Sequence, residues 1–314
     1  MKFAKLVKKT QPELKSYLAE FLTTHGYKVT ISDGWLYGDT KDGGSVLLTA
    51  HLDTVHKEPV KSIVYTEGGN VVSSPQGIGG DDRCGVWIIT EIISKTELRP
   101  PVLFCEDEEI GGVGSDKFLK AKEAKQIRRK ISDMKFIIEL DRANANDAVF
   151  YDCDNPEFTD WITETTGLKE AWGSFSDISN LCPDLGIAGV NISCGYYKAH
   201  TVQEYVVLSE MKAAAETTIK LLNAAADKSV PAFEYIEAIH KPYSWSYGDA
   251  DYGFGYGYKK SSYTRFGGVW ISWFDGDDEL EDYFSGDNLN ECFGEFFRTY
   301  PTVCWNDIAD YEFY

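Results

Sequence analysis

Three apolar runs, each of the length of one buried strand, constrain the fold of this chain more than any other feature. They are SVLLTAHLD (45–53), PVLFCEDEE (101–109) and KFIIELD (135–141). Near-continuous apolar runs are typical of strands that are covered on both faces. Patterns with helical spacing lie between them, as at CGVWIITEIIS (84–94). This alternation predicts a three-layer α/β/α fold with a mixed, mostly parallel central sheet.

The remaining elements of this fold follow from local signals. Thr10 and Glu13 form a capping box that opens a helix, which Gly26 ends. The turn signal Asp33-Gly34 joins two short strands. Further helices are predicted at 115–130, 156–168 and 209–226, and further strands at 147–153 and 187–195.

The composition changes after about residue 230. From 231 to 314 there are 16 acidic and 5 basic residues, a charge of about −11, and 11 of the 19 tyrosines. We therefore predict one catalytic domain over 1–230 and an acidic, Tyr- and Gly-rich C-terminal extension over 231–314. The extension is expected to be a poorly ordered or loosely packed appendage; the alternative is an aromatic interaction surface or a cover over part of a functional site.

The charge and the cysteine content limit the possible partners and the cellular compartment of the protein. The chain of 314 residues has a formal charge of −19, which argues against nucleic acid or an anionic membrane as a partner. The seven cysteines are odd in number and form no CxxC pair, so reduced thiols in a cytoplasmic protein are expected. No apolar run is long enough to span a bilayer.

Acidic residues and one histidine recur where the buried runs end. His51 and Asp53 follow the first run, Glu108 and Glu109 the second, and Asp141 the third. The carboxyl ends of parallel strands meet at one edge of the sheet, where ligands bind. A group of anions at that edge is costly unless a cation neutralises it. Each acid alone could be a helix cap or a solvated loop residue, but all of them together favour a cation site.

Two more motifs add ligands to this edge. GIGGDDRCG (77–85) places Asp81 and Asp82 at a Gly-rich turn before a helix, and GYYKAH (195–200) places His200 just after another strand. A plain helix N-cap is the alternative role for the aspartates. Two histidines with three carboxylates exceed the needs of one tetrahedral zinc ion. They suit two zinc ions that share a bridging carboxylate.

The order of these motifs resembles the signature of the co-catalytic di-zinc exopeptidases. AHLDTV, GGDDRCG and DEEIGGVGS are closest to peptidase T, whereas the layout resembles the compact zinc aminopeptidases. The resemblance covers residues 45 to 205 and implies the zinc exopeptidase, or phosphorylase/hydrolase-like, fold.

The resemblance also implies a role for each matching residue. His51, Asp81 and Asp141 would hold one zinc ion, and Asp81, Glu109 and His200 the other, with Asp81 as the bridge. Asp82 is an alternative bridge, and a cis peptide bond is expected between these two aspartates. Glu108 would be the general base, and Asp53 would fix the tautomer of His51. Glu106 and Asp107 are expected to be solvated loop acids.

The chain departs from many relatives in lacking an inserted lid domain, because Asp141 and His200 are only 59 positions apart. Residues of such a lid grip the substrate carboxylate in the related carboxypeptidases, so removal of N-terminal residues is favoured here. Candidate substrate-binding residues are Arg142, Ser176 and Asp177; for the Ser-Asp pair a helix cap is the favoured alternative.

The predicted function is that of an aminopeptidase that hydrolyses short peptides with a water activated by two Zn²⁺ ions; Co²⁺ or Mn²⁺ could replace them. One alternative is a deacylase or carboxypeptidase-type amidohydrolase acting on N-acyl amino acids or small amides. Another is an inactive binding module that uses the C-terminal extension. A monomer is expected, with an oligomer as the alternative.

Overall fold

An eight-stranded mixed sheet forms the centre of the first of two units, Met1–Glu237, into which the chain divides. The computed structural model describes residues 2–41, 43–57, 59–238, 269–275, 278–284, 296, 298–300 and 308–313. The strand order is β1-β2-β6-β3-β7-β10-β8-β9. The four central strands run parallel; they are β6 (Val102–Cys105), β3 (Val46–His51), β7 (Phe136–Arg142) and β10 (Gly189–Ser193). The predicted sheet is thus confirmed.

Antiparallel pairs complete the sheet on both sides. The hairpin of β1 (Lys28–Ser32) and β2 (Trp35–Asp39) turns at Gly34, whose φ of +86° suits glycine, and β2 pairs antiparallel with β6. On the other side β8 (Asp147–Val149) runs antiparallel to β10, and β9 (Lys169–Ala171) runs parallel to β8. The parallel centre therefore directs its carboxyl ends to one edge.

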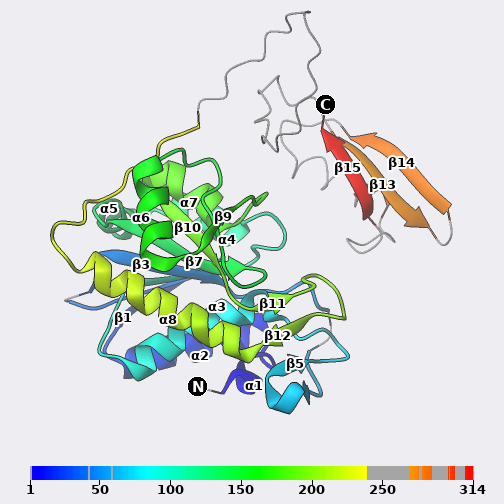
Figure 1. Cartoon of the computed structure of the whole chain (residues 1–314), viewed down its shortest axis with the longest axis horizontal. Helices are drawn as coiled ribbons and strands as arrows, with labels where there is room; N and C mark the ends of the chain where they lie inside the picture. Colours follow the sequence, from blue (N-terminus) through cyan, green and yellow to red (C-terminus); the bar gives the residue numbers. More distant parts are fainter. Residues whose placement is uncertain are drawn as a thin grey trace, which may run out of the picture. The chain divides into compact units, whose positions relative to one another are not determined.

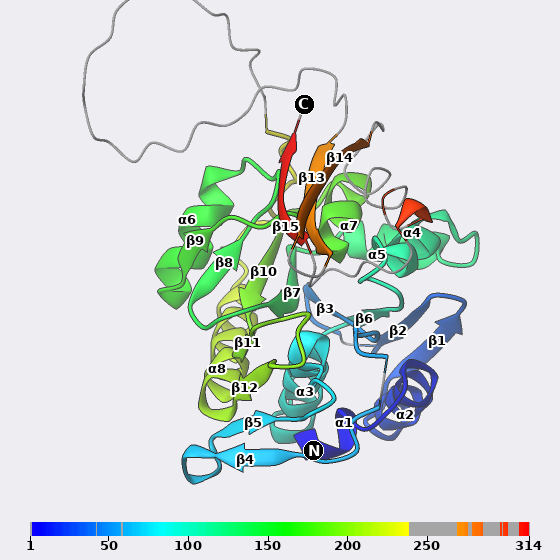
Figure 2. The ribbon, with the colours of Figure 1, turned by 90° about the vertical axis from the view of Figure 1, so that its right-hand side faces the viewer.

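Helices cover both faces of the sheet, as the pattern predicts (Figures 1 and 2). The larger core contains apolar side chains of α1 (Phe3–Leu6), α2 (Gln11–Thr24), α3 (Gly80–Lys95), α6 (Pro156–Thr166) and α8 (Leu208–Ala225). The smaller core contains those of α4 (Val113–Lys120), α5 (Lys125–Ser132) and α7 (Asp177–Leu185). At the start of α2, both the backbone nitrogen and Oγ1 of Thr10 donate to Glu13 Oε2, which confirms the predicted capping box.

The single helix predicted at 115–130 was wrong. Two helices, α4 and α5, occupy this region, and Ala121 has an extended ψ of 126° where α4 ends. Arg128 of α5 donates from Nη1 to the carbonyl oxygens of Phe118 and Ala121, at 2.8 and 2.7 Å. This side chain satisfies carbonyls that a continuous helix would have bonded internally.

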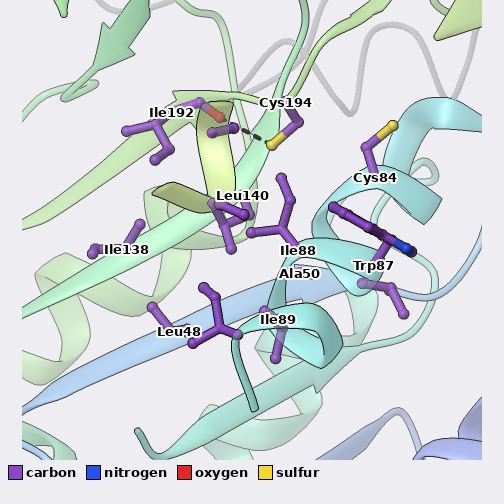
Figure 3. Packing of buried hydrophobic residues seen from close by; sticks show 14 of the residues in the cluster. Leu48, Ala50, Cys84, Trp87, Ile88, Ile89, Ile138, Leu140, Ile192 and Cys194 are labelled. Carbon is purple, nitrogen blue, oxygen red and sulfur yellow. Dashed lines mark hydrogen bonds between the residues drawn. The ribbon is translucent and has the colours of Figure 1, made fainter. Parts of the chain in front are cut away.

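The packing between α3 and the central strands holds the start of α3 against the sheet. Figure 3 shows Ile88 and Ile89 of α3 beside Leu48 and Ala50 of β3 and beside Leu140 of β7, and all five are buried. Because interiors are close-packed, this contact leaves the first turn of α3, with Asp81 and Asp82, little freedom to move away from the strand ends.

A second, four-stranded sheet was not predicted. It has the order β11-β12-β5-β4 and consists of Tyr196–Tyr197, Tyr205–Val207, Val71–Ser73 and Val64–Thr66, with the short η1 (Glu67–Gly69) between β4 and β5. Each strand has at most three residues, which is too short for a period-two pattern to be read. Pairing of β5 with β12 brings the segments around 71–73 and 205–207 together.

The second unit, Ala238–Tyr314, contains a three-stranded antiparallel sheet. Its strands are β13 (Val269–Asp275), β14 (Asp278–Phe284) and β15 (Ile308–Phe313), in the order β14-β13-β15. The Tyr- and Gly-rich stretch from 243 to 260, on which the prediction for the extension mainly rests, lies outside the described residues.

Candidate metal centre

His51 is the last residue of β3, and its buried imidazole lies at the centre of the predicted ligands. Its Nδ1 is 3.0 Å from Asp53 Oδ1. Its Nε2 is 2.9 Å from Asp81 Oδ1 and 3.3 Å from Asp141 Oδ1. Asp141 reaches this point from β7, the parallel neighbour of β3. The parallel strands and the first turn of α3 therefore bring three carboxylates to one imidazole, as expected.

Asp81 lies between the two predicted ligand histidines. Its Oδ1 faces His51, and its Oδ2 is 3.2 Å from His200 Nε2. One carboxylate with one oxygen on each side is the arrangement of a bridging ligand. The predicted cis peptide bond is present between Asp81 and Asp82.

Asp82, the alternative bridge, binds backbone instead. Its Oδ2 accepts a hydrogen bond from the backbone nitrogen of His51 at 3.1 Å, and its Oδ1 accepts one from that of Gly85 at 2.8 Å. The side chain is fully buried. This arrangement supports Asp81 as the bridging residue and gives Asp82 the task of tying α3 to the end of β3.

The four consecutive acids at 106–109 divide into two pairs. Glu108 and Glu109 face the cluster: Glu109 Oε2 is 3.1 Å from His200 Nε2, and Glu108 Oε2 is 4.0 Å from His51 Nε2. The backbone nitrogens of both residues donate to the carboxylate of Asp53, at 3.0 Å each. Asp53 thus connects His51 to the segment that carries both glutamates.

The expectation that Glu106 and Asp107 are solvated loop acids was wrong. Glu106 Oε2 pairs with Lys15 Nζ and accepts a hydrogen bond from the backbone nitrogen of Gly34 at 3.1 Å. Asp107 Oδ1 accepts one from Gln11 Nε2 at 2.8 Å. Both partners Gln11 and Lys15 belong to α2, so this helix fixes the segment through Glu106 and Asp107.

Burial and mutual repulsion perturb the acids of the cluster. Burial, followed by the charge of Asp81, raises the pKa of Asp141 to about 7 and also raises that of Glu109. Burial raises the pKa of Glu108 well above its usual range. Burial alone would lower the pKa of His51, but the carboxylates of Asp141 and Asp53 raise it. These shifts have the direction expected for an anionic site that requires a cation.

The predicted substrate-binding residues have different surroundings. Ser176, the N-cap residue of α7, is buried and donates from Oγ to Asp141 Oδ2 at 2.9 Å. Asp177 is fully buried in the first turn of the same helix, where burial raises its pKa to about 6. The Nε of Arg142 lies 3.9 Å from Asp147 Oδ2. Ser176 therefore takes the N-cap position of a helix and donates to Asp141, a predicted ligand, and the substrate roles of all three stay predictions.

Several residues that support the cluster were missed at the sequence level. Asn191 Oδ1 accepts a hydrogen bond from the backbone nitrogen of Asp141 at 2.9 Å, and Tyr196 OH donates to the Asp141 carbonyl oxygen at 3.0 Å. The buried Arg83 donates to the carbonyl oxygens of Leu52 and Asp53. The position of Arg83, directly after the two aspartates, is the one signal that could have identified it.

Glu204 was also missed, although it lies only four residues after His200. It is fully buried, and its carboxylate accepts a hydrogen bond from the backbone nitrogen of Asp81 at 2.9 Å.

The donor set fits zinc. Candidate ligand atoms of His51, Asp81 and Glu109 lie within 4.8 Å of one another, and so do those of His51, Glu108 and Asp141. Glu109 Oε1 is buried and has no hydrogen-bond partner within the described part of the chain. A buried oxygen without a hydrogen-bond partner destabilises the folded state unless an ion or a water molecule binds it. Imidazole nitrogens and carboxylate oxygens are zinc ligands, so the residues present suit this ion.

Comparisons with solved structures show the fold. The aminopeptidase PepT from Bacillus cereus superimposes with a TM-score of 0.56 at 16% identity, covering 72% of this chain and 97% of the other. A tripeptidase from Staphylococcus aureus gives 0.56 at 13%, with 71% and 96% covered. An aminopeptidase from the archaeon Desulfurococcus kamchatkensis gives 0.53 at 14%, with 71% and 93% covered.

No family model and no curated protein sequence matches the chain. The fold resemblance to peptidase T-like exopeptidases, inferred from the motifs, is thus confirmed by structure, at an identity too low to transfer an activity. Within the described residues no helix has the length and apolar character needed to cross a membrane.

Proposed function

We propose that this protein is a metal-dependent exopeptidase, and more specifically an aminopeptidase acting on short peptides with two zinc ions. The observation that carries the proposal is the position of Asp81 between His51 and His200, one carboxylate oxygen toward each. His51, Asp81 and Asp141 would hold one ion, and Asp81, Glu109 and His200 the other. When bound, the ions supply the Lewis acidity that polarises the scissile carbonyl and lowers the pKa of the attacking water.

The residues of the chain would divide the remaining tasks. Glu108 would accept the proton of the attacking water and pass it to the leaving amine. Asp53 accepts from His51 Nδ1 and therefore directs Nε2 into the cluster. Asp53 also accepts a hydrogen bond from the backbone nitrogen of Glu108. It would therefore fix the position of the predicted base relative to His51.

The absence of an inserted lid between Asp141 and His200 supports the removal of N-terminal residues. This interval contains α6, α7 and the strands β8 to β11, all of which belong to the two sheets and their covering layers. The chain therefore has no extra domain there to grip a substrate carboxylate. The acidic cluster also suits a free, positively charged amino terminus near the site.

Two other functions compete with this proposal. A deacylase or carboxypeptidase-type amidohydrolase would use the same cluster on N-acyl amino acids or small amides. A binding module would need neither Glu108 nor a complete ligand set, and the presence of both in one cluster argues against it.

Mass spectrometry of a peptide panel tests the proposal. Short peptides with a free, an acetylated or an amidated terminus are incubated with protein and zinc, with and without chelator. We expect chelator-sensitive loss of single residues from free N-termini only. Cleavage of the acetylated forms alone would indicate the amidohydrolase. No cleavage of any peptide or small amide would favour the binding module.

The proposal also includes the cellular compartment and the oligomeric state. All five cysteines in the described part of the chain are buried, free thiols, which suits the cytoplasm. We further propose a monomer, which light scattering on the purified full chain would check.

A further inference from the structure

Glu204 is a buried carboxylate with three hydrogen bonds and no place yet in the proposed chemistry. It lies between β11 and β12 and is fully buried. Its Oε1 accepts from the backbone nitrogen of Asp81 at 2.9 Å. Its Oε2 accepts from the backbone nitrogen of Gly79 at 2.8 Å and lies 2.7 Å from His56 Nε2. Glu204 therefore holds the backbone of the loop that carries Asp81. His56 is the third hydrogen-bond partner of the Glu204 carboxylate.

The Gly-rich loop is fitted closely to these two side chains. A Cβ at Gly77 would lie 2.2 Å from atoms of the His56 ring, and the φ of Gly77 is +81°. A Cβ at Gly80 would lie 2.7 Å from Tyr196 Cβ and 3.2 Å from Glu204 Oε1. These glycines thus let the backbone approach His56 and Glu204, rather than merely form a flexible turn.

Glu204 holds the backbone of one ligand of the second predicted metal site and lies near another in the sequence. It is four residues after His200, whose imidazole faces Asp81 Oδ2 and Glu109 Oε2. The backbone amide that Glu204 holds is that of Asp81 itself. Hydrogen bonds that orient ligands commonly change metal affinity 10- to 100-fold when removed. The first predicted site shares Asp81, but its other two ligands, His51 and Asp141, are held independently by Asp53, Ser176 and Asn191.

We propose that Glu204 and His56 form a positioning pair that orients Asp81 and thereby sets the affinity of the second metal ion. This inference rests on the proposed function. A carboxylate is required at 204 because it accepts from two backbone amides and one imidazole at once. A glutamine would present an N–H group to one of these donors and leave that donor buried without an acceptor.

The decisive variant is Glu204→Gln, with Glu210→Gln as the matched control. Glu210 lies in the following helix α8 and accepts from Tyr197 OH, outside the metal cluster. Zinc is titrated into the metal-free full chain by calorimetry with a competing chelator. We expect a 10- to 100-fold loss of affinity for the weaker of two sites in Glu204→Gln and a smaller loss for the tighter one, whose other ligands are held independently. Glu210→Gln should bind as the wild type does.

Two further measurements separate positioning from general stability. Amide exchange of residues 77–84, followed by mass spectrometry in the metal-free protein, should accelerate in Glu204→Gln but not in the control. His56→Leu should weaken the same zinc site, and His56→Gln, whose amide can still donate to Glu204, should restore it in part.

The outcomes distinguish this inference from the proposed function. If the wild type binds two zinc ions and Glu204→Gln binds both with unchanged affinity, the inference fails alone. An equal loss at both sites, together with a lower melting temperature, would reduce Glu204 to a structural role and also overturn it. If the wild type binds no zinc, the proposed function fails and the inference fails with it.

Discussion

The backbone nitrogen of Glu108 donates to Asp53 Oδ1 at 3.0 Å, and the same oxygen lies 3.0 Å from His51 Nδ1. A single carboxylate oxygen therefore joins the predicted general base to a predicted metal ligand. The other oxygen of Asp53 accepts from the backbone nitrogen of Glu109. Asp53 has no direct place among the metal ligands, yet it holds three residues that do the predicted chemistry.

Replacing Asp53 by asparagine should weaken metal binding and activity together. The asparagine side chain would retain one acceptor oxygen. Its NH₂ group, however, would face either His51 or the backbone N–H of Glu108 or Glu109. We expect a 10- to 100-fold loss of zinc affinity, measured by competition with a chelating dye. Unchanged affinity would show that His51 needs no orientation by Asp53. Asp160→Asn, at a position in α6 away from the cluster, serves as the control.

Replacing Glu108 by glutamine should separate catalysis from metal binding. The variant keeps the size of the side chain but cannot accept a proton, and general bases contribute about 10²- to 10⁴-fold to rate. We expect kcat to fall by that factor on the best peptide of the panel, while zinc content by mass spectrometry stays at the wild-type value. Near-normal turnover would exclude Glu108 as the base. Glu97→Gln, at an exposed position after α3, is the matched control.

The contact between α2 and the acidic segment should contribute to stability. Lys15 Nζ pairs with Glu106 and also donates to the Ser32 carbonyl oxygen at 2.7 Å, with only 12% of the Lys15 side chain exposed. Lys15→Met should lower the free energy of unfolding by about 1.5–3 kcal/mol, as for a lost hydrogen bond to a charged group. Urea denaturation followed by circular dichroism would measure it.

Lys120→Met provides the control for this comparison. Lys120 pairs with Asp116 one helical turn away, and 76% of its side chain is exposed. Such pairs contribute about 0.3–0.5 kcal/mol. A loss as small in Lys15→Met as in Lys120→Met would contradict the proposed anchoring of the acidic segment.

Zinc should stabilise the protein more as the pH rises. In the metal-free protein the raised pKa of Asp141, about 7, means that the folded state keeps a proton which the unfolded state releases near pH 4. Between these values the metal-free fold therefore loses stability as the pH rises. The raised pKa of His51 acts in the same direction above its ordinary value. Zinc binds the deprotonated ligands, so protons compete with it at low pH.

The measurement is the melting temperature with zinc or with chelator at pH 5.5 and at pH 8.0. The difference between the two conditions should be larger at pH 8.0, and it should shrink in Asp81→Asn at both values. A shift that is independent of pH would contradict ligand deprotonation at this site.

The fold and the clustering of the candidate ligands could be predicted because they depend on local and periodic signals. A buried apolar run that is followed by polar residues shows both its burial and its terminus in the sequence, as at His51 and Asp53 after the first run and at Asp141 after the third. The turn at Gly34 and the capping box at Thr10 depend on residues within four positions of each other. Parallel topology then brings separate strand ends together without further information.

The supporting contacts could not be predicted, because they depend on pairs far apart in the sequence. Glu204 meets Asp81 across 123 positions, and Lys15 meets Glu106 across 91. Nothing near Glu106 indicates that α2 will lie beside it, so a solvated loop acid was the simpler interpretation. The break between α4 and α5 depends instead on a nearby contact, in which the side chain of Arg128 folds back onto the carbonyl oxygens of Phe118 and Ala121.

Zinc stoichiometry tests the central claim, a carboxylate of Asp81 shared by two metal ions, most directly. The full chain is loaded with zinc, freed of excess metal and measured by inductively coupled plasma mass spectrometry, beside Asp81→Asn and His200→Ala. We predict two zinc ions per chain in the wild type, one in His200→Ala, and fewer than one in Asp81→Asn because both sites lose a ligand. One ion in the wild type, unchanged in His200→Ala, would contradict the account.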